Sequence, residues 1–351
     1  MTKHVHGGNT AAFQAEYGMP PLDFSANVSP LGMPHSARKA AEEALTDAHA
    51  YPDPDCKTLR EALAAKRGIP MEHILCGNGV SDLICRFVAA KKPVRALIPV
   101  PSFSEYETAC CFYGCDVTRY VMREENGFLP GEDFPDEIKS DTDVLFLAQP
   151  NNPTGKTLPR DLLRRIVKRC DETGTLLMTD ECFLPFLDEP GAHTLMGEYT
   201  SHRIMILRAF TKFYGMAGLR LGYAISADTA LLKNMSEAGG PWAVSNVAQA
   251  AGVAALRDEA YEMRLRALIR EQRVILSEEL QEAGCRVIAG EANYLLFYHA
   301  DKELQERLAW RGIAIRDCAN FPGLDRGWYR VAVRAANENE QLVRAIREVQ
   351  T

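Results

Sequence analysis

Short apolar runs alternate with amphipathic stretches between about residues 74 and 225. The apolar runs predict buried strands at residues 73–76, 94–100, 143–148, 175–179, 203–207 and 221–226. Between them, residues 80–90 and 159–172 carry apolar positions at helical spacing, with breaker residues at their ends. Continuous apolar strands that alternate with helices are typical of a mostly parallel sheet covered on both faces, so this part of the chain is predicted to be α/β.

The pattern changes beyond about residue 227. A long charged helix is predicted at residues 258–282, with short strands at 286–288, 294–298, 314–316 and 329–333. This indicates a smaller α+β domain. The first residues, to about position 34, are rich in Gly, Pro and Asn and have little periodicity, so we expect an arm that completes the site. The predicted units are an N-terminal segment (1–40), a large domain (41–230) and a small C-terminal domain (231–351).

Composition narrows the possible partners. The hydrophobic content of 46% and charged content of 25% are ordinary for a globular enzyme. The net charge is −7 and no basic block is present, so neither nucleic acid nor an anionic membrane is an expected partner. The N-terminus lacks the apolar core of a signal peptide, and no apolar run approaches the ~20 residues of a membrane span. The ten cysteines form no Cys-x-x-Cys pair, which favours reduced thiols in the cytoplasm. His4 and His6 have no accompanying ligand cluster, so no metal site is expected.

Polar residues follow directly after several predicted strands. Gly79, Asn152, Asp180 and Lys212 each come just beyond an apolar run. In open α/β sheets, ligands bind outside the carboxyl ends of the strands, so we expect these residues to converge at one edge. Taken alone, each has a plainer interpretation, since most lysines are solvated and Asn and Asp are common turn or helix-cap residues.

The surroundings of Lys212 point to specific chemistry. Thr211 precedes it, and Arg220 follows in a glycine-flanked turn. A lysine at a strand end beside a phosphate clamp is the arrangement that pyridoxal phosphate requires, because the amine bonds to the cofactor aldehyde. A carboxylate such as Asp180 facing the pyridine nitrogen would keep the ring protonated, and a helix starting near Val80 would offer free N–H groups to the phosphate.

Three strings in this order resemble the fold-type-I pyridoxal-phosphate enzymes: residues 151–155 (NNPTG), 179–181 (TDE) and 211–223 (TKFYGMAGLRLGY). The resemblance extends nearly end to end, through residues 51–53 (YPD), 77–82 (GNGVSD) and 101–103 (PSF). It implies a fold-type-I transferase with a large domain built on a mostly parallel seven-stranded sheet and a smaller C-terminal α+β domain. It also implies pyridoxal 5'-phosphate as the cofactor.

Within this superfamily the chain resembles the histidinol-phosphate aminotransferase branch, and there the L-threonine-O-3-phosphate decarboxylases of cobalamin synthesis. The most specific strings are residues 6–9 (HGGN) and 315–324 (IRDCANFPGL). Phe183 agrees with this, because many aminotransferases carry a tyrosine there. The resemblance implies decarboxylation of L-threonine O-3-phosphate to (R)-1-amino-2-propanol phosphate. Two alternatives stay open: a histidinol-phosphate or related class I/II aminotransferase, and a phosphoserine decarboxylase.

The resemblance also implies a role for each site residue. Lys212 and Asp180 would be catalytic, the first by bonding to the cofactor and moving protons, the second by holding the ring proton. The expected cofactor contacts are Gly79, Val80, Phe103, Asn152, Asp180, Thr211, Lys212, Arg220 and Tyr51. The expected substrate contacts are Asn152 and Arg330 for the carboxylate and His6, Asn27 and Arg316 for the phosphate. Tyr51 would reach the cofactor of a neighbouring subunit, so a homodimer with shared sites is expected.

Overall fold

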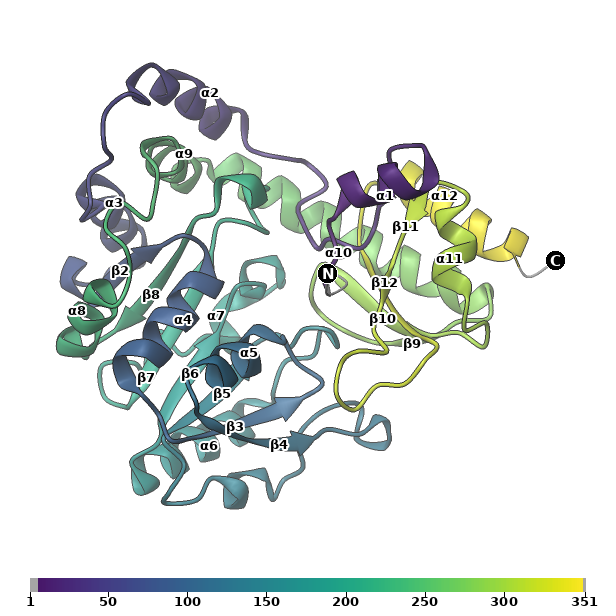
Figure 1. Cartoon of the computed structure of the whole chain (residues 1–351). Coiled ribbons are helices and arrows are strands. Elements are labelled where there is room, and N and C mark those ends of the chain that lie inside the picture. Colours follow the sequence, from purple (N-terminus) through teal and green to yellow (C-terminus); the bar gives the residue numbers. More distant parts are fainter. Residues whose placement is uncertain (1–5, 350–351) are drawn as a thin grey trace.

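A seven-stranded sheet forms the centre of the larger part of the molecule (Figure 1). The computed structural model describes residues 6–349. The strands of this sheet are β2 (Ile74–Gly77), β3 (Arg95–Val100), β4 (Asp116–Val121), β5 (Val144–Ala148), β6 (Leu176–Asp180), β7 (Ile204–Ala209) and β8 (Gly222–Ser226). Their order is β2-β8-β7-β6-β5-β3-β4, and every pairing is parallel except those of β8. The predicted mostly parallel sheet is confirmed.

Helices cover both faces of this sheet. In the view of Figure 1, α4 (Val80–Lys91) and α5 (Glu105–Phe112) lie in front of the strands and α6 (Arg160–Thr173) lies behind them. Helix α6 shows why the sequence pattern is helical, because its apolar residues recur at three- and four-residue spacing and are all buried: Leu162, Leu163, Ile166, Val167 and Cys170. The helix ends where Gly174 adopts the left-handed conformation, with φ of 75°.

Strand β4 was not predicted from the sequence. It pairs in parallel with β3 alone and forms one edge of the sheet. Its side chains are exposed or only half-buried, and they include Asp116, Thr118 and Arg119. An edge strand needs no continuous apolar run, because solvent covers much of its surface. The polar sequence of β4 therefore gave no sign of a strand, which forms through main-chain hydrogen bonds to β3.

The smaller part of the chain is built on a four-stranded antiparallel sheet in the order β12-β13-β10-β9. Its strands are β9 (Arg286–Ile288), β10 (Tyr294–Tyr298), β12 (Arg316–Asp317) and β13 (Trp328–Ala332). The predicted strand at 314–316 is wrong in one respect. It is split at Ile315, so that β11 (Ile313–Ala314) pairs instead with β1 (Leu22–Asp23) of the N-terminal segment. The split lets one short stretch join two sheets.

The N-terminal segment is attached to the small domain. Strand β1 runs parallel to β11, and Ala332 N donates to Phe24 O at 2.8 Å. The segment also contains a helix that the sequence pattern did not predict, α1 (Thr10–Tyr17), whose first turn is capped by the Asn9 side chain. The division into units 1–40, 41–230 and 231–351 stays a prediction.

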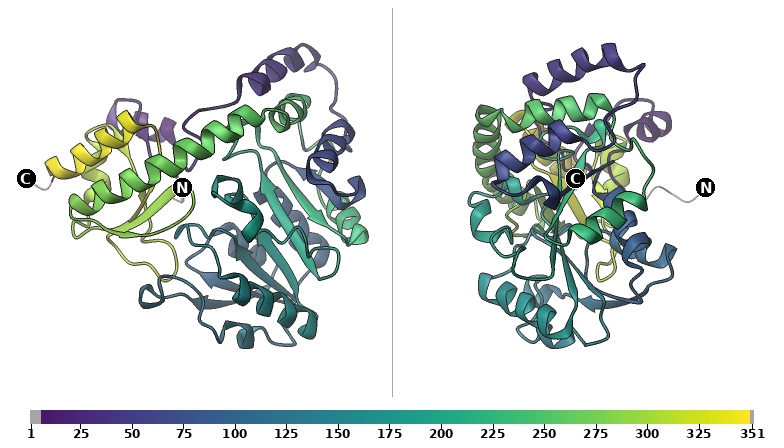
Figure 2. Two further views of the ribbon diagram at one scale, coloured as in Figure 1. Left: turned by 180° about the vertical axis from the view of Figure 1, so that it is seen from behind. Right: turned by 90° about the vertical axis from the view of Figure 1, so that its left-hand side faces the viewer.

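A 24-residue helix, α10 (Glu259–Glu282), runs from the large domain into the small one (Figure 2). In the small domain it packs against α12 (Ala336–Val349), which also contacts α11 (Leu304–Ala309). The remaining helices are α2 (His35–Ala44), α3 (Lys57–Arg67), α7 (Pro190–His193), α8 (Thr229–Glu237) and α9 (Asn246–Leu256). In the part of the chain that the structure describes, no helix combines the length and apolar character needed to cross a membrane.

Candidate active site

A cavity of about 390 Å³ opens at the carboxyl ends of β5, β6 and β7, beside the start of α4. Three of the four strand-end residues expected to converge, Asn152, Asp180 and Lys212, line this cavity. The predicted site residues that line this cavity are His6, Asn27, Val80, Phe103, Asn152, Asp180, Thr211, Lys212, Arg220 and Arg330. Three others, Gly79, Tyr51 and Arg316, are not part of its lining. The roles of all these residues remain predictions.

Lys212 lies just past the end of β7 and is buried in the cavity wall. Its main-chain oxygen accepts hydrogen bonds from Ser29 N at 2.9 Å and Gly215 N at 3.2 Å, which fix the turn. Burial, together with the cationic side chains of Arg330 and Arg220, lowers the pKa of Lys212 to about 8. A substantial fraction of this amine is therefore neutral and nucleophilic slightly above neutral pH.

Asp180 ends strand β6, and both of its carboxylate oxygens accept hydrogen bonds. Tyr106 donates its hydroxyl to Oδ2 at 2.6 Å, and the main-chain N–H of Cys182 donates to Oδ1 at 2.9 Å. The carboxylate is thereby fixed at the cavity wall. Sequence reasoning missed Tyr106, whose position three residues after Phe103 was the only available signal.

The start of α4 and Arg220 form a cationic corner of the site. Gly79 precedes the helix with φ of 79°, and a Cβ there would lie only 2.6 Å from Arg220 Nη2. Glycine at this position therefore lets the guanidinium lie over the helix start. Among the described residues, Arg220 donates a side-chain hydrogen bond to Ala217 O at 3.3 Å and makes no ion pair. Free N–H groups beside an available guanidinium suit a phosphate dianion.

Arg330 occupies the opposite wall, on β13. It donates to the Asn152 side-chain oxygen and, at 2.8 Å, to Ser25 O, while its guanidinium lies 5.5 Å from the centre of the Tyr294 ring. Its Nε is buried without a hydrogen-bond partner, as is Oδ1 of Asn27. Buried polar atoms are normally paired, so two unpaired ones in one cavity fit a site that takes a polar ligand.

His6 and Arg316 belong to a neighbouring cavity of about 1050 Å³, which lies between the N-terminal segment and the small domain. His6 lines both cavities and thus marks their junction. Its Nε2 lies 2.8 Å from Glu105 Oε1, and its ring centre lies 5.9 Å from that of Phe103. Arg316 donates to Asn320 Oδ1 at 2.7 Å. His4, the other histidine considered as a metal ligand, lies outside the described residues.

Tyr51 lies away from the cavity on the surface of the same chain. It is 80% exposed and stacks on Trp242, which is 45% exposed, with ring centres 4.4 Å apart. Its predicted contact with a neighbouring subunit stays a prediction. Within residues 6–349, no group of three or more His, Cys, Asp or Glu side chains could hold a metal ion.

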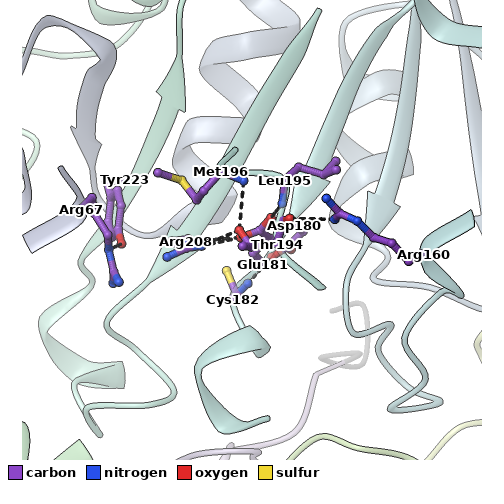
Figure 3. Close-up of polar contacts among 10 residues, drawn as sticks. All are labelled: Arg67, Arg160, Asp180, Glu181, Cys182, Thr194, Leu195, Met196, Arg208 and Tyr223. Atoms are coloured by element: carbon purple, nitrogen blue, oxygen red, sulfur yellow. Dashed lines mark hydrogen bonds and ion pairs between the residues drawn. The ribbon is translucent and has the colours of Figure 1, made fainter. Parts of the chain in front are cut away.

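A buried ion pair stabilises the turn that carries Asp180 (Figure 3). Glu181 is 0% exposed, and its carboxylate accepts hydrogen bonds from Arg208 Nη2 at 2.6 Å, Thr194 Oγ1 at 2.9 Å and Leu195 N at 2.9 Å. Arg208 belongs to β7 and Glu181 directly follows the end of β6, so the pair joins the ends of two adjacent strands, next to Asp180 and four residues before Lys212. Sequence reasoning assigned Glu181 no structural role.

Comparison with known proteins gives the family. Residues 20–349 match the family described as aminotransferase class I and II. The chain belongs to this family. It is 40% identical over 353 residues to a threonine-phosphate decarboxylase of Salmonella typhimurium, an alignment that covers 99% of this chain and 97% of that protein.

Solved structures confirm the fold of this aminotransferase-family chain. The histidinol-phosphate aminotransferase of Clostridium acetobutylicum has a TM-score of 0.87 at 28% identity, covering 93% of this chain and 98% of that one. The L-threonine-O-3-phosphate decarboxylase of Porphyromonas gingivalis has a TM-score of 0.81 at 26% identity, with coverage of 93% and 98%. The fold-type-I prediction is confirmed, and the chain is an enzyme that uses pyridoxal phosphate. The buried amine, the fixed carboxylate and the cationic corner described above fit this cofactor.

Proposed function

We propose that the enzyme is a cytoplasmic decarboxylase that converts L-threonine O-3-phosphate to (R)-1-amino-2-propanol phosphate in cobalamin synthesis. The observation that carries this proposal is the full-length similarity to threonine-phosphate decarboxylase at 40% identity. The site supports it, because guanidinium groups lie at separate places, Arg330 in the wall of one cavity and Arg316 in the neighbouring cavity, which meets the first at His6. A substrate with a carboxylate and a phosphate needs two such anchors. Ten free cysteines agree with a reducing compartment.

Each residue then has a defined task. Arg330 and Asn152, which are hydrogen-bonded to each other in the cavity wall, bind the substrate carboxylate. Bound pyridoxal phosphate supplies an electron-accepting ring for the bond that breaks. Lys212 would anchor this cofactor, and its amine would carry a proton to or from the substrate carbon. Asp180 holds the proton of the ring nitrogen, while Gly79, Val80, Thr211 and Arg220 bind the cofactor phosphate and Phe103 stacks on its ring.

Substrate orientation decides the reaction. Only a bond held perpendicular to the plane of the cofactor ring overlaps with its π system. The position of the carboxylate anchor Arg330 relative to the phosphate anchors His6, Asn27 and Arg316 therefore selects loss of carbon dioxide over transamination. Phe183 contacts Tyr294 edge-to-face, with ring centres 4.9 Å apart, so this side of the cavity presents an apolar ring.

The deciding experiment is product analysis with threonine phosphate, phosphoserine and histidinol phosphate, each with and without a 2-oxo acid. We expect carbon dioxide and aminopropanol phosphate from threonine phosphate, with no need for a 2-oxo acid. Slower release of carbon dioxide from threonine phosphate than from phosphoserine would change the substrate assignment. Turnover only with histidinol phosphate and a 2-oxo acid would refute the decarboxylase.

An aminotransferase is the second candidate. It is favoured by the histidinol-phosphate aminotransferase structure, whose TM-score of 0.87 exceeds the 0.81 of the solved decarboxylase. Both activities need the amine of Lys212, so the variant Lys212→Ala is expected to lose either one while keeping the fold. Arg316→Ala should mainly weaken the binding of the phosphorylated substrate, by about 2–5 kcal/mol if the charge pair is desolvated, and so tests binding apart from the chemical step. Unchanged affinity would exclude Arg316 from the site.

We also propose that two copies share their sites through Tyr51. The exposed stack of Tyr51 on Trp242 supports this, because two adjacent exposed aromatic rings are suited to a protein contact. Mixed dimers of Lys212→Ala with Tyr51→Ala subunits test it. If Tyr51 acts on the neighbouring subunit, each mixed dimer regains one site with both native residues, and activity returns. Mixed dimers as inactive as either parent, or an active monomer, would refute the sharing.

A further inference from the structure

Tyr106 is a buried residue that contacts Asp180 and Phe103, the two side chains predicted to bind the cofactor ring. Its hydroxyl donates to Asp180 Oδ2 at 2.6 Å. Its ring meets that of Phe103 edge-to-face, with centres 5.5 Å apart. The same ring stacks on Phe146 of β5, with centres 5.3 Å apart and planes inclined by 17°, so Tyr106 has little freedom to move.

The hydroxyl is a donor under all ordinary conditions. Burial and the neighbouring Asp180 carboxylate raise the pKa of Tyr106 well above its usual value, so the phenol keeps its proton. Cys182 N–H donates to the other carboxylate oxygen at 2.9 Å. Donors to both oxygens of a carboxylate hinder its rotation. The Asp180 carboxylate is therefore held in a fixed orientation at the cavity wall.

We propose that Tyr106 is a positioning residue that holds the Asp180 carboxylate in the orientation in which it meets the ring nitrogen of pyridoxal phosphate. This inference rests on the proposed contact between Asp180 and the ring nitrogen. A carboxylate that loses a donor on one oxygen is free to turn, and its hydrogen bond to the ring nitrogen then has poorer geometry. Tyr106 thus acts on the cofactor through Asp180, without touching it.

Cofactor binding isolates this effect. Protein freed of cofactor is titrated with pyridoxal phosphate and with its carbon analogue, in which C–H replaces the ring nitrogen. Both compounds have the aldehyde and the phosphate, so the ratio of their dissociation constants reports only the contact at the nitrogen. Native protein should favour pyridoxal phosphate. Tyr106→Phe should reduce this preference by roughly tenfold or more, the size expected for losing a hydrogen bond to a charged group, with little change in affinity for the carbon analogue.

Two further variants make the result decisive. Tyr199→Phe is the matched control, since it removes another buried tyrosine hydroxyl, 2.9 Å from His73 Nδ1 and outside the cavity lining. It should keep the native preference. Asp180→Asn should abolish the preference, and if it does not, the proposed contact between Asp180 and the ring nitrogen fails.

If Asp180→Asn abolishes the preference while Tyr106→Phe keeps the native value, the role of Tyr106 alone is refuted. An equal loss of affinity for both compounds in Tyr106→Phe would indicate general damage to the pocket and would also overturn the inference. Phenylalanine keeps both ring contacts, so the variant should fold, with a thermal unfolding midpoint lowered only by the loss of one hydrogen bond.

Discussion

The buried amine of Lys212 is expected to make the cofactor-free enzyme less stable at neutral pH. Its pKa is about 8 in the folded protein and 10.5 in its ordinary state, so the unfolded chain binds more protons between these values. The free energy of unfolding therefore rises as the pH increases from about 8 to 10.5. Below about pH 8 the folded protein bears the full free-energy cost of burying the charged amine. A difference of 2.5 pKa units corresponds to about 3 kcal/mol.

The perturbation is Lys212→Met, which keeps the length of the side chain and removes its charge. Urea unfolding of cofactor-free protein should show the variant to be more stable than the native protein by about 3 kcal/mol at pH 7, narrowing to about 2 kcal/mol at pH 9. Lys168→Met serves as the control, because this lysine is 79% exposed and should show no such pH-dependent gap. A variant less stable than native at pH 7, or a gap that does not narrow, would refute the reasoning.

Three further predictions concern the surroundings of the site. Arg208→Met leaves the Glu181 carboxylate buried without its ion partner and should lower the free energy of unfolding in urea by about 3–5 kcal/mol. Adding Glu181→Gln should recover most of this loss, and an unchanged urea midpoint in the single variant would contradict the prediction. Arg330→Lys should raise the KM for substrate far more than the dissociation constant for pyridoxal phosphate, because one ammonium cannot make paired hydrogen bonds to a carboxylate; equal changes would count against it. Gly79→Ala should weaken cofactor binding at least tenfold in equilibrium titration, because the added Cβ displaces Arg220 and the backbone φ disfavours alanine; native affinity would disprove that packing argument.

The buried helices and strands were predictable because their apolar residues recur at a spacing that shows which side is buried. The strand predicted at 175–179 is β6 (Leu176–Asp180), and the helix predicted at 258–282 is α10 (Glu259–Glu282). Both bury apolar side chains at regular spacing, which any reader of the sequence can see. The edge strand β4 was hidden, since its pairing with β3 depends on main-chain hydrogen bonds that leave no apolar pattern.

The candidate site was predictable only in part. Residues at the ends of strands, such as Asp180 and Lys212, were found because the topology of a parallel sheet brings strand ends together. The contact between Tyr106 and Asp180 joins positions 74 residues apart, and only the packing of α5 on the sheet creates it. Arg316 lines a different cavity from Arg330 although their strands are paired. Pairing fixes the main chain, while the direction of each side chain depends on neighbours that a sequence does not show.

The attachment of the N-terminal segment to the small domain places most of the proposed substrate contacts and most of the proposed cofactor contacts in different parts of the fold. Asn27 and Arg330 lie in segments that are bonded to each other. The Arg330 side chain donates a hydrogen bond to Ser25 O, and β1 of the N-terminal segment pairs with β11 of the small domain. Lys212 and Asp180 belong instead to the seven-stranded sheet. Apart from Asn152, the side chains proposed to bind the substrate therefore lie outside the seven-stranded sheet whose strand ends carry the proposed cofactor contacts. On these proposed roles, a change of substrate would alter mainly the N-terminal segment and the small domain, while the cofactor contacts stay as they are.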